Sequence, residues 1–186
     1  MFKRILHKVK SRNIGRATER LLSRRQPSGR NKRLTSMGVI MDEDSYSDTE
    51  MFYHLGKDLG IHRKDIRILG YEALAGKTPT MRMNVIHDKD ISWKGEILAS
   101  EASDFLERPF DLLIGYFQVK NPSLNLLTAK SNAHFKVGLS GVDQRLFDLI
   151  VAVEVEKGTL FAREVVRYMQ KLDKIGPLKK EQFSNL

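Results

Sequence analysis

Short, mostly apolar runs recur along the chain and are separated by polar segments. Continuous apolar runs, without regular alternation of polar residues, are typical of strands that are buried on both faces of a sheet. They predict five strands, at residues 37–41, 66–71, 110–116, 135–139 and 149–153, and a weaker run predicts a sixth at 83–86.

Between these runs, apolar residues recur at steps of three and four, which is the period of an amphipathic helix. Ser47 and Glu50 have the spacing of a capping box at the start of one helix, and Gly60 can end it. Asn121-Pro122 starts another helix with proline at its first helical position. The pattern predicts helices at about 48–59, 100–106, 122–129 and 159–172.

The alternation of strands with helices indicates an α/β fold. We expect a three-layer sandwich with a mostly parallel sheet of four to six strands, whose order the pattern does not set. A basic helical arm precedes this sandwich. By composition the chain divides into a basic arm and linker (1–33), an α/β domain (34–176) and a tail (177–186).

Charge separates the arm from the rest of the chain. Twelve Lys and Arg and a single acid, Glu19, give residues 1–33 a net charge of +11. The remaining residues hold 20 basic and 22 acidic side chains, which give −2, so the body is nearly neutral. The candidate contacts for nucleic acid or another polyanion are the twelve cations Lys3, Arg4, Lys8, Lys10, Arg12, Arg16, Arg20, Arg24, Arg25, Arg30, Lys32 and Arg33.

Three kinds of partner fit this arm. Arg outnumbers Lys eight to four, which favours phosphate groups and hence RNA or the ribosome. Residues 1–25 also have an apolar helical stripe, and a basic amphipathic helix can bind an anionic membrane surface. The same stripe can pack in a groove of another protein or on the body of this chain.

Loops after the predicted strands are candidate ligand contacts, because ligands of parallel sheets bind beyond the carboxyl ends of the strands. The acidic loop at 42–44 can hold a hard cation, although a solvated turn before a helix explains it more simply. The loop at 139–145 can cradle an anion, and a tight turn explains Gly138 and Gly141 equally well. The candidate ligand residues are Asp42, Asn121, Ser140, Gly141 and Arg145.

Catalytic and metal sites are not expected. The chain has no cysteine, which excludes disulfides, thiolate metal sites and a cysteine nucleophile. The chain contains neither of the glycine-rich phosphate-binding motifs, Gly-x-x-x-x-Gly-Lys-Ser/Thr and Gly-x-Gly-x-x-Gly. Its five histidines do not have the spacing of metal ligands. Ser140, Asp143 and His134 come without the Gly-x-Ser-x-Gly elbow of a hydrolase. We therefore predict no catalytic residue, no metal and no cofactor.

Two further expectations concern Trp93 and location. Trp93 lies in a polar loop, where it can contact a partner or, more simply, fold back over a sheet edge. No apolar run reaches the roughly 18–20 residues of a membrane span. The N-terminus has cations but no apolar segment after them, so it does not predict a secretory signal. We expect a cytoplasmic protein.

Three blocks, at 110–114, 127–133 and 135–141, resemble an uncharacterised bacterial family of small basic α/β proteins, a domain of unknown function. The resemblance extends from about Lys3 to Ile175 and implies a fold and a bacterial cytoplasmic setting. The same block is similar to the N-terminal half of the lipopolysaccharide heptosyltransferases. Those enzymes bind the sugar nucleotide mainly through a second Rossmann-like domain, for which this chain has no room, so transferase activity is not expected.

The leading hypothesis is a non-enzymatic protein whose basic arm contacts RNA or the ribosome. The alternatives are a module that docks on a membrane or a protein, and a small-ligand-binding or enzymatic domain that uses the strand-end loops. The sequence predicts neither the identity of a small-molecule ligand nor the oligomeric state.

Overall fold

The computed structural model describes residues 2–26, 33–73 and 84–175, with side chains described from residue 6 onward. The side chains of four candidate cations, Lys3, Arg4, Arg30 and Lys32, are outside the described part of the chain. The predicted tail at 177–186 is also outside it.

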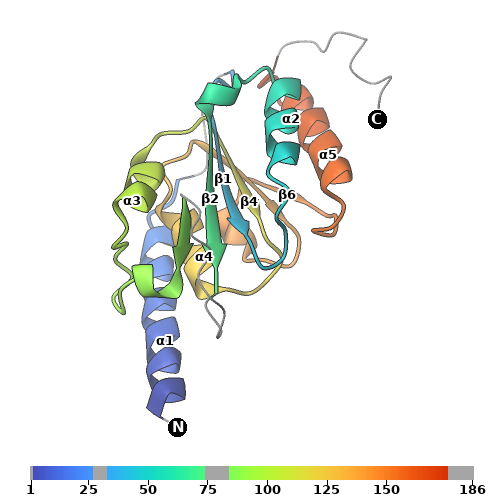
Figure 1. The fold of residues 1–186 in the computed structure, drawn as a ribbon. Helices are drawn as coiled ribbons and strands as arrows, with labels where there is room; N and C mark the ends of the chain where they lie inside the picture. The colour runs from blue at the N-terminus through green and yellow to red at the C-terminus, as the bar shows by residue number, and fades with distance from the viewer. Residues whose placement is uncertain (1, 27–32, 74–83, 176–186) are drawn as a thin grey trace.

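Six parallel strands form one sheet in the order β3-β2-β1-β4-β5-β6 (Figure 1). The order reverses between β1 and β4, and this is the order of the doubly wound nucleotide-binding folds. The α/β fold with a parallel sheet is therefore confirmed, with the sheet entirely parallel. The strands are β1 (Met37–Asp42), β2 (Ile66–Glu72), β3 (Val85–His87), β4 (Leu112–Tyr116), β5 (Phe135–Leu139) and β6 (Leu149–Val151).

Helices cover both faces of this sheet. α2 and α5 pack together on one face, and α3 and α4 lie on the other (Figure 1). α1 runs alongside α4 as an outer helix. The helices are α1 (Phe2–Leu22), α2 (Glu50–Asp58), α3 (Ser100–Glu107), α4 (Pro122–Lys130) and α5 (Gly158–Lys171), with single 3-10 turns at Arg63–Asp65, Asp88–Asp90 and Gln144–Leu146.

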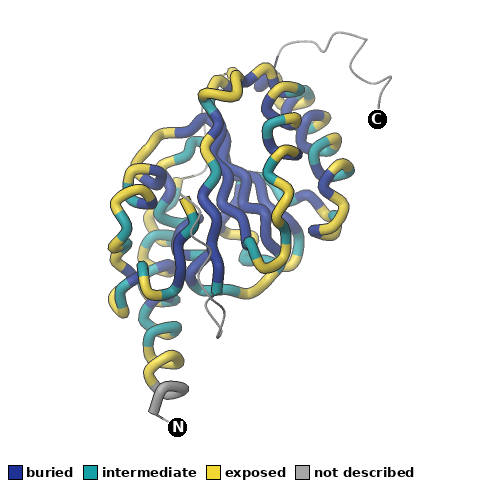
Figure 2. Tube along the Cα trace, viewed as in Figure 1, coloured by how far each residue is buried: buried dark blue, intermediate teal, exposed yellow. Residues whose placement is uncertain are grey.

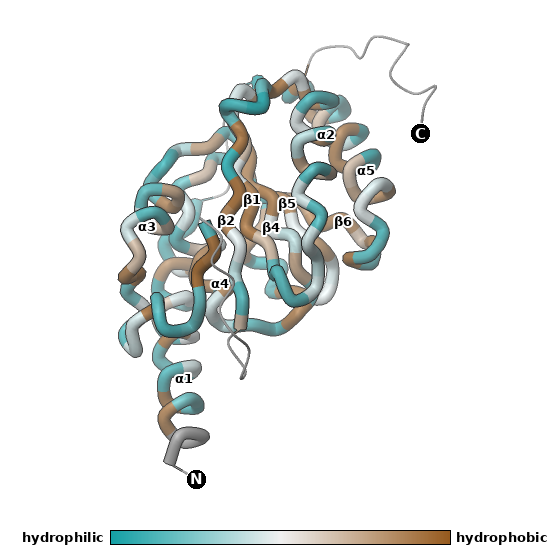
Figure 3. Tube along the Cα trace, in the orientation of Figure 1, coloured by the Kyte–Doolittle hydropathy of each residue, from teal (hydrophilic) through white to brown (hydrophobic). Residues whose placement is uncertain are grey.

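The central strands have almost no exposed surface (Figure 2). Successive side chains of a strand point to opposite faces, so Val39 packs towards α2 and α5 whereas Ile40 packs towards α3 and α4. Both faces must then be apolar, as the hydropathy colouring of the strands shows (Figure 3). This is why the strands are continuous apolar runs in the sequence.

One local expectation was wrong. Ser47 does not cap α2; the Asp48 carboxylate accepts the backbone N–H groups of Glu50 (3.0 Å) and Met51 (3.4 Å) instead. The helix begins at Glu50 with Thr49 at its N-cap position, so Ser47 lies two residues before the capping position. A carboxylate is also the better partner there, because it favours the positive end of the helix dipole.

Candidate functional site

α1 is held on the body by a small apolar cluster. Ile14 is 2% exposed and packs with Ile91 and Leu126, while Ala17 and Leu21 lie against the same group. These positions are three or four residues apart, so they share one face of the helix. The inner face of α1 therefore packs on the body, and its outer face is exposed to solvent.

Ion pairs hold the C-terminal end of α1. Arg25 pairs with Asp148 at 2.8 Å and donates to the carbonyl oxygen of Arg145 at 2.7 Å. Glu19 pairs with Arg145 at 2.6 Å, and Arg145 also holds Asp143 at 2.7 Å. The hydrogen bonds from Arg145 lower the pKa of Asp143. Glu19, the one acid of the basic segment, is therefore engaged by the body and does not neutralise its own helix.

Five cations of the segment turn away from the body. They follow one another at steps of four residues. The first four lie in a row on the outer surface of α1, and the last lies in the turn that follows the helix. All are exposed, and none forms an ion pair in the part of the chain that the structure describes. We call them the basic row: Lys8, Arg12, Arg16, Arg20 and Arg24.

The basic row does not stabilise the fold. Like charges four residues apart in a helix repel by about 0.2–0.5 kcal/mol per pair. From Lys8 to Arg20 the row extends about 18 Å at 1.5 Å per residue. A row of this kind costs folding stability until an external anion compensates it.

The other sequence-predicted cations are placed differently. The amino group of Lys10 donates to the carbonyl oxygen of Asp88, and Arg25 is paired as described above. Arg33 is exposed just before β1. Among the described side chains, the candidate cations therefore do not share one surface: Lys10 and Arg25 contact the body, whereas the basic row lies on the outer side.

The first turns of α1 extend past the carboxyl edge of the sheet (Figure 1). Leu6 and Val9 are 54% and 49% exposed there. Among the described residues no helix has the combination of length and apolar character that crossing a bilayer requires.

A cavity of about 590 Å³ opens at the carboxyl edge of the sheet, where the strand order reverses. It brings together Asp42, the last residue of β1, and Asn121, which follows β4, and adds His7 and Lys10 from α1. The nearby Asp88 is part of its wall. The sequence predicted the strand-end residues of this cavity but not the contribution of α1.

The polar groups of this cavity are mostly engaged with one another. Asp42 accepts from the hydroxyl of Ser45, and the Asn121 side chain accepts the N–H of Ser123 at 2.8 Å at the start of α4. The Tyr71 hydroxyl donates to Asp88 at 2.6 Å. Burial, followed by this hydrogen bond, raises the pKa of Tyr71 to about 12, so the hydroxyl keeps its proton. These hydrogen bonds stabilise the turns at the carboxyl ends of the strands, and this structural role explains why the polar residues are present.

The remaining candidate ligand residues lie elsewhere. Ser140 and Gly141 follow β5 and do not line the cavity, and Gly141 has a φ of +89°, which suits a tight turn. Arg145 is held by Glu19 and Asp143. Asp42 and Asn121 therefore line the same cavity, whereas Ser140, Gly141 and Arg145 lie outside it.

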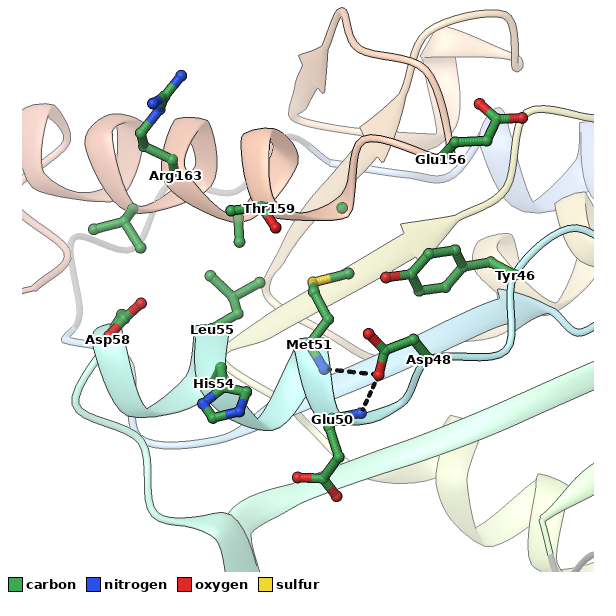
Figure 4. Close-up of a pocket in the computed structure, with 13 residues that line it drawn as sticks. Tyr46, Asp48, Glu50, Met51, His54, Leu55, Asp58, Glu156, Thr159 and Arg163 are labelled. Carbon is green, nitrogen blue, oxygen red and sulfur yellow. Dashed lines mark hydrogen bonds between the residues drawn. The ribbon is translucent and has the colours of Figure 1, made fainter. Parts of the chain in front are cut away.

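A second cavity, of about 580 Å³, lies between α2 and α5 (Figure 4). Met51 and Leu55 of α2 face Thr159 of α5 across it, and carboxylates such as Asp58 stand at its edge. Burial raises the pKa of Asp58. The sequence analysis missed this cavity, because its two walls are more than a hundred residues apart and neither has a motif.

In the described part of the chain, no group of three or more His, Asp or Glu residues is arranged to hold a metal ion. His87 comes nearest to such an arrangement: its ring nitrogens lie 3.3 Å from carboxylate oxygens of Glu72 and Asp90. The contact with Glu72 joins β3 to β2 at the edge of the sheet, and the contact with Asp90 caps the 3-10 turn that follows β3.

Trp93 is 60% exposed rather than folded against a sheet edge, so that expectation was wrong. The loop that carries Trp93 contacts α1 at Ala17 and is held by hydrogen bonds to the Ser92 hydroxyl.

Comparison with known proteins adds a family but no activity. A model described as "Family of unknown function (DUF6913)" matches residues 10–172, a range that includes most of α1. No curated protein and no solved structure matches the chain.

Proposed function

We propose that this chain, which belongs to the family of unknown function DUF6913, is a non-enzymatic protein that binds RNA through the outer face of α1. The observation that carries the proposal is the basic row, five exposed cations in line without an acidic partner among the described residues. Phosphate groups along a strand supply the missing anions. Four of the five are arginines, whose planar guanidinium can bind a phosphate with two hydrogen bonds.

Nucleic acid suits this face better than a membrane does. Between Arg12 and Arg24 the outer face has no large apolar side chain, whereas a membrane-bound helix needs an apolar face turned to the lipid. The exposed Leu6 and Val9 are confined to the projecting end of the helix. A cytoplasmic setting, where RNA and ribosomes are abundant, fits this function.

The near-neutral body supports the same function. Since residues 34–186 contribute a net charge of −2, the excess positive charge of the molecule comes from residues 1–33, whose described part is mostly α1. Such segregation steers a polyanion to the row without binding it everywhere.

Substitution of the row tests the proposal. The variant Lys8→Gln/Arg12→Gln/Arg16→Gln/Arg20→Gln removes four charges and keeps helix propensity. We expect its affinity for a labelled 12-nucleotide oligouridylate to fall about 10²–10³-fold at 0.1 M salt, measured by fluorescence anisotropy.

The matched control removes four exposed cations from the α2 and α5 side: Lys57→Gln/Lys157→Gln/Arg163→Gln/Lys171→Gln. It has the same net charge as the test variant, and we expect its affinity to fall by less than tenfold. Equal losses in both variants would mean that net charge alone governs binding, and the proposal would be wrong. Binding only to phosphatidylglycerol vesicles, and not to RNA, would also overturn it.

A further inference from the structure

Trp93 is the only tryptophan of the chain, and 60% of its surface is exposed. Tryptophan is mostly buried in folded proteins because its ring is large and apolar. A ring exposed to this degree leaves much of its hydrophobic surface in water. Such a ring is expected where a partner covers it.

The loop that carries Trp93 is firmly built. The Ser92 hydroxyl oxygen accepts the N–H groups of Lys94 (3.2 Å) and Glu96 (3.0 Å), and the N–H of Ser92 donates to the Glu96 carbonyl at 2.8 Å. Gly95 has a φ of +84°, a conformation that side chains rarely allow. A bridge between Ile91 and Ile97 closes the turn. Trp93 is thus held outward with little freedom to fold back.

This turn lies directly against α1 (Figure 1). A Cβ on Gly95 would be 3.2 Å from the Cβ of Ala17, so the backbone of the turn touches the helix. Ile91 shares the apolar cluster of Ile14 that docks the helix. At 3.6 residues per turn, Ala17 lies about 60° around the helix axis from Arg20 and about 100° from Arg16. The turn therefore meets α1 at the edge of its inner face that is next to these two arginines of the basic row.

Lys94 adds a cation at the ring. Its amino group lies 5.6 Å from the centroid of the Trp93 ring and is exposed. An aromatic face with neighbouring cations is the arrangement by which proteins bind single strands: phosphates follow the cations and a base stacks on the ring.

We propose that Trp93 is a stacking platform for an unpaired base, so that the RNA of the proposed function is single-stranded. This inference rests on the proposed function, since the basic row supplies the phosphate contacts. A base within a duplex is already stacked on its neighbours and cannot cover the ring. Trp93 therefore distinguishes single strands from duplexes, whereas the basic row binds both.

The single tryptophan makes the test direct. Stacking of a base quenches the fluorescence of the ring, and no other tryptophan contributes to the signal. We expect the 12-nucleotide oligouridylate to quench the emission of the wild-type chain. A 12-base-pair RNA duplex, bound at the same saturation as judged by anisotropy, should leave the emission nearly unchanged.

Two variants separate stacking from charge. Trp93→Ala should weaken single-strand binding about 5- to 150-fold, the range for loss of one stacked base, and leave duplex binding within twofold. Trp93→Phe keeps an aromatic face and should restore most of the single-strand affinity. Unchanged melting temperatures would show that both variants fold.

The failures of the two proposals differ. If both RNAs bind with strong salt dependence but Trp93→Ala binds the single strand as wild type does, the stacking inference is wrong and the proposed function stands. If neither RNA binds, the proposed function fails and the stacking inference fails with it. A blue shift of the emission with phosphatidylglycerol vesicles, without quenching by RNA, would overturn both in favour of a membrane.

Discussion

Lys136 illustrates how a charged residue is accommodated inside this fold. It lies in β5, the strand next to the edge strand β6, and is 5% exposed. Its amino group donates to the carbonyl oxygens of Thr128 (2.7 Å) and Ser131 (2.8 Å) at the end of α4. A cation at this position satisfies carbonyls that a helix end leaves free. Burial, followed by the charge of Arg25, lowers the pKa of Lys136 to about 8.

This lowered pKa gives a pH dependence of stability. Between about pH 8 and 10.5 the unfolded chain holds a proton on Lys136 that the folded chain has released. Stability should therefore rise with pH across this window, by on the order of 3 kcal/mol for this group. Lys136→Met removes the titrating group. The unfolding free energy of the wild type should therefore rise relative to that of the variant as the pH increases. Parallel pH profiles, measured by urea denaturation, would contradict the buried cation.

Replacement of two glycines by alanine should change the stability of the protein in opposite directions. A Cβ on Gly138 would lie 2.8 Å from the Phe147 ring, whereas a Cβ on Gly15 of α1 would meet nothing within 4 Å. Gly138→Ala should therefore destabilise the protein by about 1–3 kcal/mol through overpacking. Gly15→Ala should stabilise it by about 0.5–1 kcal/mol, because glycine is unfavourable inside a helix. Thermal unfolding of both variants checks the pair, and a shift of the same sign in both would be inconsistent with the packing.

Gly138 also marks a limit of the sequence analysis. For Gly138 and Gly141, a tight turn explains the sequence as well as an anion-binding loop does, and the structure supports the turn only at Gly141, with its φ of +89°. Gly138 lies inside β5, where the Phe147 ring approaches it and Gly115 of β4. Nothing in the local sequence indicates which ring will lie over a strand nine residues earlier.

Elements with continuous apolar runs were predicted well. The strand at 135–139 has the predicted bounds, and the other strands begin or end within a few residues of them. Burial on both faces leaves a signal in every residue of such a strand. The apolar stripe of residues 1–25 had left docking on the body of the chain as one alternative, and α1 does dock there. The sequence does not indicate where it docks, because the partners Ile91 and Leu126 are about 75 to 110 residues away and are not distinguished from any other apolar residue.

The docking of α1 can be tested as an element. Ile14 is 2% exposed, so Ile14→Ala should cost about 2–4 kcal/mol if α1 unfolds together with the body. Leu6 is 54% exposed on the same helix, and Leu6→Ala is the control that should change stability by less than about 0.5 kcal/mol. Urea denaturation gives both values.

Hydrogen exchange of the backbone amides of α1 distinguishes a helix docked on the body from a helix that moves independently of it. A docked helix should protect the amides around Thr18, and Ile14→Ala should reduce that protection before it affects β4. If the amides of α1 exchange freely in the wild type, the helix is not held as the structure places it, and the basic row has no fixed direction.

At the scale of the whole molecule, charge is distributed unevenly over a compact sandwich. The basic row lies on one side of the sheet, and the cavity edged by Asp58 lies between α2 and α5 on the other. The row repels itself, so removing it should not harm folding. The variant Lys8→Gln/Arg12→Gln/Arg16→Gln/Arg20→Gln should be as stable as wild type or more stable by roughly 0.6–1.5 kcal/mol, from the loss of three like-charge pairs.

The salt dependence of RNA binding measures the contacts of the basic row most directly. For five cations on the phosphates of a single strand, the logarithm of the affinity should fall with the logarithm of salt concentration with a slope of about −3.5. The four-glutamine variant should have a slope near −0.7, while the control variant on α2 and α5 should keep the slope of wild type. A wild-type slope close to zero, or an equal slope in all three proteins, would contradict the claim that this row holds RNA.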